Sequence, residues 1–113
     1  MKIEIDETAE QKIIRLEGEF FLDNLKFVEE TWDRLKVIGP RVVAIDFSGV
    51  TSIDSSALGL LVKIFNNSIN LKIELIFIDL SEYALKLFKA ARLMNFFKIM
   101  EKKQYQRKYM SEY

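Results

Sequence analysis

The chain has 113 residues, of which half are apolar and 30% are charged, and its formal net charge is zero. This length and balance predict one folded domain over residues 1–113 without disordered segments. The sequence contains no histidine and no cysteine. Their absence excludes disulfides, thiolate nucleophiles, Ser-His-Asp triads and Cys/His zinc sites. Any enzyme of this composition would have to work with carboxylates, lysines and hydroxyls.

Charge and hydropathy also limit the classes of partner. Acidic residues predominate before Ser55 and basic residues after it, but the balanced total argues against direct nucleic-acid binding. We interpret the basic C-terminal segment as the solvated face of a helix. No apolar run approaches the ~18 residues that a membrane span needs, and no signal peptide opens the chain. A cytoplasmic location without membrane insertion is expected.

A β-hairpin opens the predicted fold. Apolar and polar residues alternate over residues 2–6, and a second strand follows at 12–16 after a polar turn at 8–11. Residues 17–19 are expected to end this strand, with Gly18 free to adopt a positive φ.

Helices and strands then alternate along the chain. Asp23 or Asn24 can cap a helix to about Ile38, because an apolar stripe including Trp32 ends at Gly39-Pro40. A buried strand is expected at 42–47, followed by a loop at 48–53 and a helix from about Ser55 that is broken at 66–70. A strand at 71–78, a helix capped by Ser81 and a short edge strand within 93–99 come next. The chain ends in a possible C-terminal helix or tail at 101–113, in which Tyr105 and Tyr109 lie one turn apart. This order predicts an α/β domain with a central mixed sheet, right-handed crossovers and about four covering helices.

The junction between the buried strand and its helix carries Asp54-Ser55-Ser56. A helix N-terminus has unpaired N–H groups and about half a positive charge. Either Asp54 or Ser55 can cap this helix, which leaves a hydroxyl in the first turn. A phosphate on that hydroxyl adds about −1.5 to −2 charges where the helix dipole tolerates them best, although Asp54 repels it. The spacing does not choose between Ser55 and Ser56, and an ordinary helix cap is the alternative interpretation.

Two segments around this junction are Val43-Ala44-Ile45-Asp46-Phe47-Ser48-Gly49-Val50 and Ile53-Asp54-Ser55-Ser56-Ala57-Leu58-Gly59-Leu60-Leu61. Together they resemble the signature of the STAS domain. The likeness is closest to the bacterial anti-sigma-factor antagonists and extends over most of the chain, including residues 16–18 and 92–99. Two residues depart from the family pattern. Ala57 stands where glycine is frequent, and Asn70 replaces the glycine of the turn before the next strand.

The resemblance implies a regulator of transcription that is not an enzyme, carries no metal or other cofactor, and acts by partner switching. Such a protein binds an anti-sigma factor serine kinase, releases a sigma factor, and is switched off when the kinase uses ATP to phosphorylate the serine that opens the second helix. A phosphatase restores binding. By position the phosphorylated residue is Ser56, with Ser55 as the alternative. Partner contacts are expected at Ser48, Thr51, Ser52, Asp54, Ser55 and Ala57. A homodimer is compatible with this pattern.

Two other interpretations remain open at this point. Asp46, Asp54 and Asp79 could meet at the C-terminal edge of the sheet and hold magnesium, as in receiver domains, but the opening hairpin does not fit that fold. Alternatively, the chain is a STAS scaffold in a signalling assembly or a lipid or anion transporter complex. Its serines would then only cap the helix.

Overall fold

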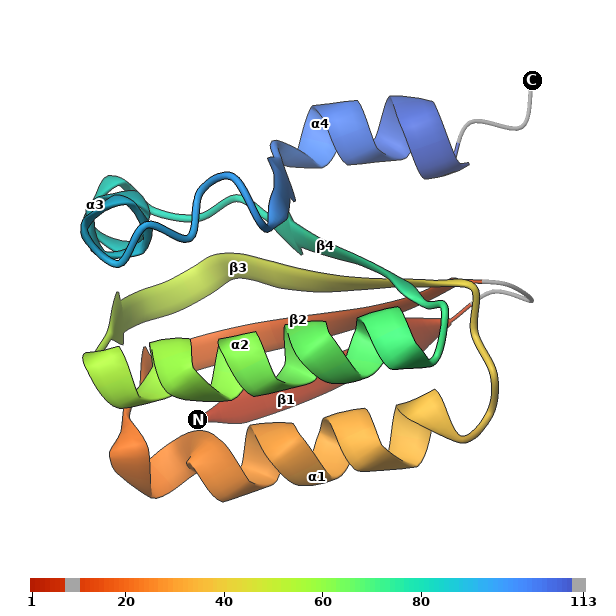
Figure 1. Ribbon diagram of the computed structural model, residues 1–113, viewed down its shortest axis with the longest axis horizontal. Helices are drawn as coiled ribbons and strands as arrows, with labels where there is room; N and C mark the ends of the chain where they lie inside the picture. Colours follow the sequence, from red (N-terminus) through yellow and green to blue (C-terminus); the bar gives the residue numbers. More distant parts are fainter. Residues whose placement is uncertain (8–10, 111–113) are drawn as a thin grey trace.

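The computed structural model describes residues 1–7 and 11–110 and places five strands in one sheet. Figure 1 shows the sheet with its covering helices. The strand order is β1-β2-β3-β4-β5. β1 runs antiparallel to β2, and the other neighbouring pairs are parallel, so the predicted mixed sheet with an opening hairpin is confirmed. Residues 8–10 of the predicted polar turn lie outside the described residues. The strands are β1 (Lys2–Glu7), β2 (Gln11–Phe20), β3 (Val42–Ile53), β4 (Glu74–Ile78) and β5 (Lys98–Met100).

The helices lie on both faces of this sheet. In Figure 1, α1 and α2 lie along one face and α4 lies on the other. A 3₁₀ turn (Leu22–Asn24) precedes α1, and a π-helical turn (Gln106–Met110) continues α4. The four α-helices are α1 (Leu25–Lys36), α2 (Ser55–Asn70), α3 (Glu82–Ala90) and α4 (Lys102–Tyr105).

The main core lies between the sheet and α1, α2 and α3. It takes alternate residues of the strands, such as Val43 and Ile45 of β3, while Ala44 between them faces the opposite side. Both faces of β3 are therefore covered, which explains its unbroken apolar sequence. Trp32 is 2% exposed in this core, as predicted. Its Nε1 donates a hydrogen bond to Oδ1 of Asn67, 2.8 Å away.

A smaller apolar cluster lies under α4 on the opposite face. Tyr105 is buried there, and its ring stacks on that of Tyr109 with 5.0 Å between the centroids. The Tyr105 hydroxyl donates to Oε1 of Gln11 at 3.0 Å. The segment expected as a C-terminal helix or tail is helical from Lys102 and changes to π geometry at Gln106. Its last three residues, 111–113, lie outside the described residues. The cluster consists of Ile13, Ala44, Ile76, Ile78 and Tyr105.

The predicted loop at 48–53 is wrong, because β3 continues to Ile53 beside an extended β2. Their pairing contains register shifts, and Gly49 permits the close approach of the two strands. A Cβ at Gly49 would lie 2.9 Å from the backbone oxygen of Leu16. Gly18 has the predicted positive φ of 104°, but β2 runs through it to Phe20.

The predicted break at 66–70 is also wrong, because α2 runs to Asn70. The polar residues near its end have partners within the fold. Asn67 accepts the Trp32 indole hydrogen, and the hydroxyl of buried Ser68 donates to the Phe65 carbonyl at 2.6 Å. The residue with positive φ in the following turn is Lys72, at 59°, and not Asn70.

The ends of several other elements differ by a few residues from the bounds predicted from the sequence. α1 ends at Lys36, before Gly39 with its φ of 82°. Asn24 occupies the N-cap position of α1 without a side-chain cap, because its amide donates to the carbonyl of Glu19 at 2.7 Å. The strands β4 and β5 begin later than residues 71 and 93, whereas Ser81 caps α3 as predicted, accepting from the Ala84 amide at 3.1 Å.

Candidate functional site

The junction between β3 and α2 is organised by the carboxylate of Asp54. Its extended backbone, with φ −110° and ψ 175°, places the side chain over the first turn of α2. Oδ1 accepts from the backbone amide of Ala57 at 3.0 Å and from the hydroxyl of Ser56 at 2.5 Å. Asp54 is therefore the helix cap, which resolves the choice between Asp54 and Ser55.

Asp54 also connects α2 to the end of β2. Its Oδ2 accepts from the Leu22 amide at 3.2 Å, and its own amide donates to the Phe20 carbonyl at 3.3 Å. Partial burial raises the pKa of Asp54, but the hydrogen bonds from Ser56, Ala57 and Leu22 outweigh burial and hold it below its ordinary value. The carboxylate is ionised at neutral pH and no cationic side chain pairs with it among the described residues.

The other residues expected at this site differ in their exposure. Ser55 and Thr51 are exposed, and Ser52 and Ser56 are half-buried. Ala57, which was also expected to contact the partner, is fully buried in the main core, so its side chain lies beneath the surface of the junction. The surface of the junction thus consists of Thr51, Ser52, Asp54, Ser55 and Ser56.

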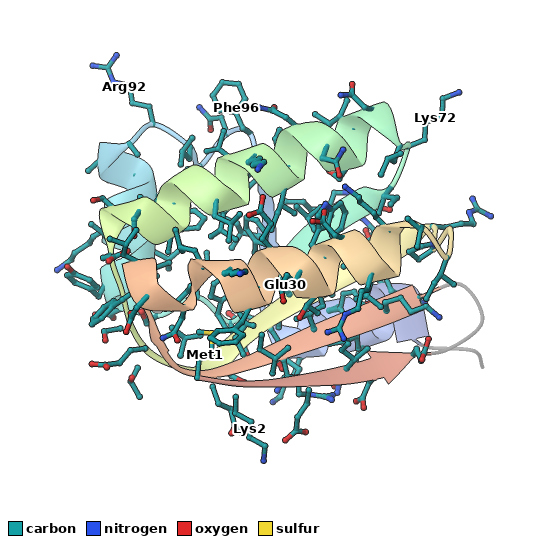
Figure 2. The ribbon with its side chains drawn as sticks, turned by 90° about the horizontal axis from the view of Figure 1, so that it is seen from below. Met1, Lys2, Glu30, Lys72, Arg92 and Phe96 are labelled. Carbon is teal, nitrogen blue, oxygen red and sulfur yellow. The ribbon has the colours of Figure 1, made fainter. Side chains whose placement is uncertain are left out.

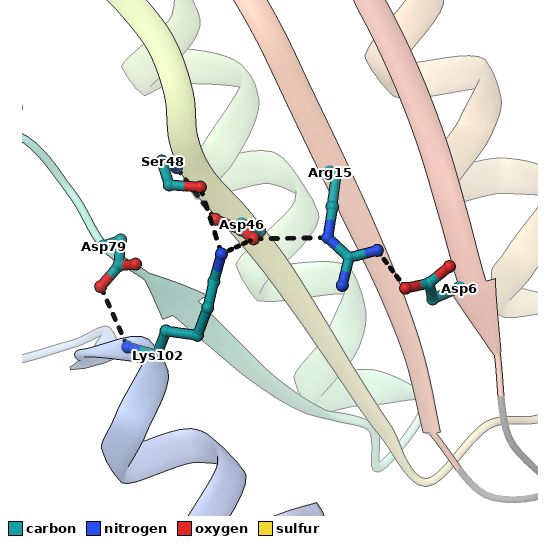
Figure 3. A network of polar contacts seen from close by, with 6 residues as sticks. All are labelled: Asp6, Arg15, Asp46, Ser48, Asp79 and Lys102. Atoms are coloured by element: carbon teal, nitrogen blue, oxygen red, sulfur yellow. Dashed lines mark hydrogen bonds and ion pairs between the residues drawn. The ribbon is translucent and has the colours of Figure 1, made fainter.

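Ser48 belongs to a different polar network, on the face covered by α4 (Figure 3). At the centre of this network is Asp46, which is 2% exposed. Its carboxylate lies 3.0 Å from Nζ of Lys102 and 3.6 Å from Nε of Arg15, and it accepts from the Ser48 amide at 2.9 Å. Arg15 also pairs with Asp6.

The electrostatics of Asp46 follow from these neighbours. Burial raises the pKa of its carboxyl, but the hydrogen bonds from Ser48 and Lys102 and the charge of Lys102 together lower it below its ordinary value. Lys102 contacts Ser48 as well, with Nζ 3.4 Å from the hydroxyl oxygen. The Asp46 carboxylate is therefore held in its ionised form between the side chains of Lys102 and Arg15.

Asp46 and Asp79 do not form the magnesium site considered from the sequence. The Lys102 amide donates to Asp79 at 2.9 Å while its ammonium group contacts Asp46, so one lysine stands between the two acids. Asp54 is engaged at the start of α2. Within residues 1–7 and 11–110, no group of three or more His, Cys, Asp or Glu side chains has a geometry suited to a metal ion.

Sequence reasoning did not identify Arg15 and Lys102 as partners of Asp46. The available signal was Asp46 itself, a carboxylate within an apolar strand that must be paired if it is buried. Which cation supplies that pair depends on contacts between distant segments.

Comparison with known proteins agrees with this architecture. The family model described as the STAS domain matches residues 2–105. The chain belongs to the STAS domain family. No curated protein matches it by sequence. Among the helices of the described residues, none combines the length and apolar character that crossing a bilayer requires.

Solved structures share the fold at low sequence identity. The anti-sigma factor antagonist SpoIIAA in its unphosphorylated form aligns over 94% of this chain and 95% of its own, with 19% identity and a TM-score of 0.79. The phosphorylated form of SpoIIAA from Bacillus covers 91% and 95%, with 18% identity and a TM-score of 0.71. TM1081 from Thermotoga maritima covers 96% and 95%, with 17% identity and a TM-score of 0.86.

Proposed function

We propose that this STAS protein is an anti-sigma-factor antagonist whose binding to an anti-sigma factor kinase is switched off by phosphorylation of Ser56. The observation that carries the proposal is the Ser56 hydroxyl held by the Asp54 carboxylate, 2.5 Å away, at the start of α2. The family supports the general role. SpoIIAA, which has this fold, is known in unphosphorylated and phosphorylated forms.

Phosphorylation reverses the interaction between the two side chains. The Ser56 oxygen takes the γ-phosphoryl group of ATP, its hydrogen is lost as a proton, and ADP leaves. The hydrogen that bonded Asp54 is then absent, and the phosphate oxygens repel the carboxylate. The N–H groups and dipole of α2 offset this repulsion, so the fold persists while the surface gains about two negative charges.

Asp54 favours Ser56 over Ser55 as the modified residue. It is the acceptor of the Ser56 hydroxyl hydrogen, so the oxygen has a defined position before the kinase binds. Ser55 is more exposed and remains the alternative acceptor. The contact surface for the kinase is Thr51, Ser52, Asp54, Ser55 and Ser56, with Ser48 at its margin. A phosphatase acting on the same surface restores binding, and these reactions take place in the cytoplasm.

The proposal is tested with the serine kinase of the anti-sigma type from the same genome. We expect mass spectrometry after incubation with Mg-ATP to find one phosphate, on Ser56. Ser56→Ala should abolish it, and the matched variant Ser55→Ala should retain it. Phosphate on Ser55 alone would reassign the site.

No phosphate on either serine would remove the switch and favour the scaffold alternative. In that case, assembly with a signalling complex or an anion or lipid transporter should be indifferent to Ser56→Asp.

A further inference from the structure

We infer that β1 forms the interface of a two-fold homodimer, pairing antiparallel with β1 of a second copy. β1 is an end strand of the sheet, so its outer edge offers N–H and C=O groups that no strand of the described chain pairs. Such an edge is a template for another strand. This inference does not depend on the proposed function.

The charges of β1 are complementary to themselves in one antiparallel register. With Ile3 of each copy on the two-fold axis, Lys2 stands opposite Glu4 of the second copy, and Glu4 stands opposite Lys2. Both side chains are exposed, at 66% and 49%, and they already approach one another within a copy, with Nζ and Oε1 3.0 Å apart. Opposite charges directly across a strand pair stabilise it, whereas like charges destabilise it.

The other face of β1 is apolar and incompletely covered. Met1 and Ile5 are 38% and 39% exposed, and Phe27 of α1 beside them is 58% exposed. In the same register Met1 faces Ile5 of the second copy and Ile3 faces Ile3, so the two copies would bury these side chains together. The charged face is separate: Figure 2 shows Lys2 extending away from the body of the molecule, whereas Met1 lies toward α1.

A groove of about 240 Å³ runs beside this apolar strip, between β1 and α1. Its lining includes Glu30 and Arg34, one acid and one base of α1, so the groove has no excess charge to repel a copy of itself. A surface that pairs with a second copy of itself must be self-complementary. The edge of β1 and the groove beside it meet this condition both in charge and in apolar character. The full lining is Met1, Ile3, Ile5, Phe27, Glu30, Thr31 and Arg34.

Alternative registers are less favourable. A shift by one residue places charged side chains opposite apolar ones, because successive residues of a strand point to opposite faces. A shift by two places Glu4 opposite Glu4 and Lys2 opposite Asp6. Asp6 therefore distinguishes the two registers. It lies opposite Lys2 in the shifted register, but it has no opposite residue within β1 when Ile3 lies on the axis.

Sedimentation equilibrium of charge-reversal variants tests the inference. We expect a reversible dimer for the native chain. Lys2→Glu and Glu4→Lys should each weaken dimerisation at least tenfold, because each places like charges across the interface twice. Mixing the two variants should restore a heterodimer in which every charged pair is again opposite in sign. The contact between Lys2 and Glu4 within one copy is lost in both variants, so recovery on mixing reports only the contact between copies.

Asp6→Asn is the matched control, and it should dimerise as the native chain does. A strong loss in Asp6→Asn would contradict the Ile3-centred register. A monomer at all concentrations, or a dimer unaffected by both reversals, would overturn the interface itself. Urea unfolding of each variant verifies that it is folded.

Discussion

Two carboxylates, one within β3 and one directly after it at the start of α2, are held by the fold in different ways. Asp46 is buried and is paired with Lys102 and Arg15. Asp54 is half-buried and receives hydrogen bonds from the Ser56 hydroxyl and two backbone amides, without a cationic partner among the described residues. The first site neutralises a charge within the fold, whereas the second leaves a charge at the surface.

This difference separates a structural carboxylate from one suited to regulation. The partners of Asp46 come from β2 and α4, so its network joins segments distant in sequence (Figure 3). The nearest partner of Asp54 is the Ser56 hydroxyl, which is the group that we propose the kinase phosphorylates. A change at Ser56 alters the surroundings of Asp54 directly, and it leaves the Asp46 network intact.

Lys102→Met should produce the largest loss of stability, about 3 kcal/mol, because among the described residues it leaves the buried Asp46 with the more distant Arg15 as its cationic partner. Lys103→Met, at an exposed position of the same helix, is the control and should change little. Urea unfolding measures both. Equal effects of the two substitutions would show that the Asp46 network does not stabilise the face covered by α4.

Gly49→Ala should cost about 2 kcal/mol, because the new Cβ would lie 2.9 Å from the Leu16 carbonyl oxygen and force β2 and β3 apart between the two carboxylates. Gly59→Ala in α2 meets no atom within 4 Å and should gain up to about 1 kcal/mol. Thermal unfolding compares the variants. A neutral Gly49→Ala would contradict the need for glycine at this close approach.

Alkaline pH should destabilise the face covered by α4 by about 2 kcal/mol. Burial raises the pKa of Tyr105 to about 12, with smaller contributions from Tyr109 and Glu74. The unfolded chain releases this proton near pH 10. Between about pH 10 and 12 the unfolded state therefore binds fewer protons, and stability falls as pH rises. Across this pH interval, the unfolding midpoints of Tyr105→Phe should fall less steeply than those of the native chain. An equal fall in both proteins would contradict the raised pKa of Tyr105.

Asp54→Ala should cost about 1 kcal/mol through loss of the α2 cap. Asp54→Ser retains a capping oxygen and should recover most of this stability, while lacking the charge that repels a phosphate on Ser56. Denaturant midpoints of the three proteins measure the cap. If Asp54→Ser were no more stable than Asp54→Ala, the carboxylate would serve for more than capping in the unmodified fold.

Acid should act on both carboxylates in the same direction. The folded-state pKa of each is lowered by its hydrogen bonds despite burial. Each carboxylate therefore stabilises the fold at pH values above its pKa in the unfolded chain, about 3.9. This stabilisation is lost as the pH falls through the pKa of the folded state. Unfolding midpoints at descending pH should decline less in Asp46→Asn and in Asp54→Asn than in the native chain. An unchanged decline in either variant would contradict the lowered pKa of that residue.

Local patterns predicted much of the fold. Alternation identified the opening hairpin, and apolar stripes identified α1, α2 and α3, because each pattern depends on residues close in sequence. The continuation of β3 to Ile53 was missed, since Ser48-Gly49 and Thr51-Ser52 have the composition of a loop. Only the neighbouring β2 keeps this segment extended, and the pairing of Phe20 with Ile53 could not be found in either strand alone.

The candidate site was located by sequence but not resolved within it. Asp54-Ser55-Ser56 indicated a helix start, whereas the choice of Asp54 as cap and its bond to Ser56 required the backbone geometry. The continuation of α2 past Asn67 likewise involves a distant residue, Trp32. Its indole N–H donates to the side-chain oxygen of Asn67, which could otherwise form a hydrogen bond with a nearby backbone group and compete with the helix.

In the proposed switch, the state of Ser56 decides whether the anti-sigma kinase binds. Isothermal titration of the kinase compares the unmodified chain with a chain that carries phosphoserine at position 56 and with a matched chain that carries it at position 55. We predict that the modification at 56 weakens binding at least tenfold relative to the unmodified chain, and that the modification at 55 has a smaller effect. Equal affinity of the unmodified chain and the chain modified at 56 would contradict the proposed switch.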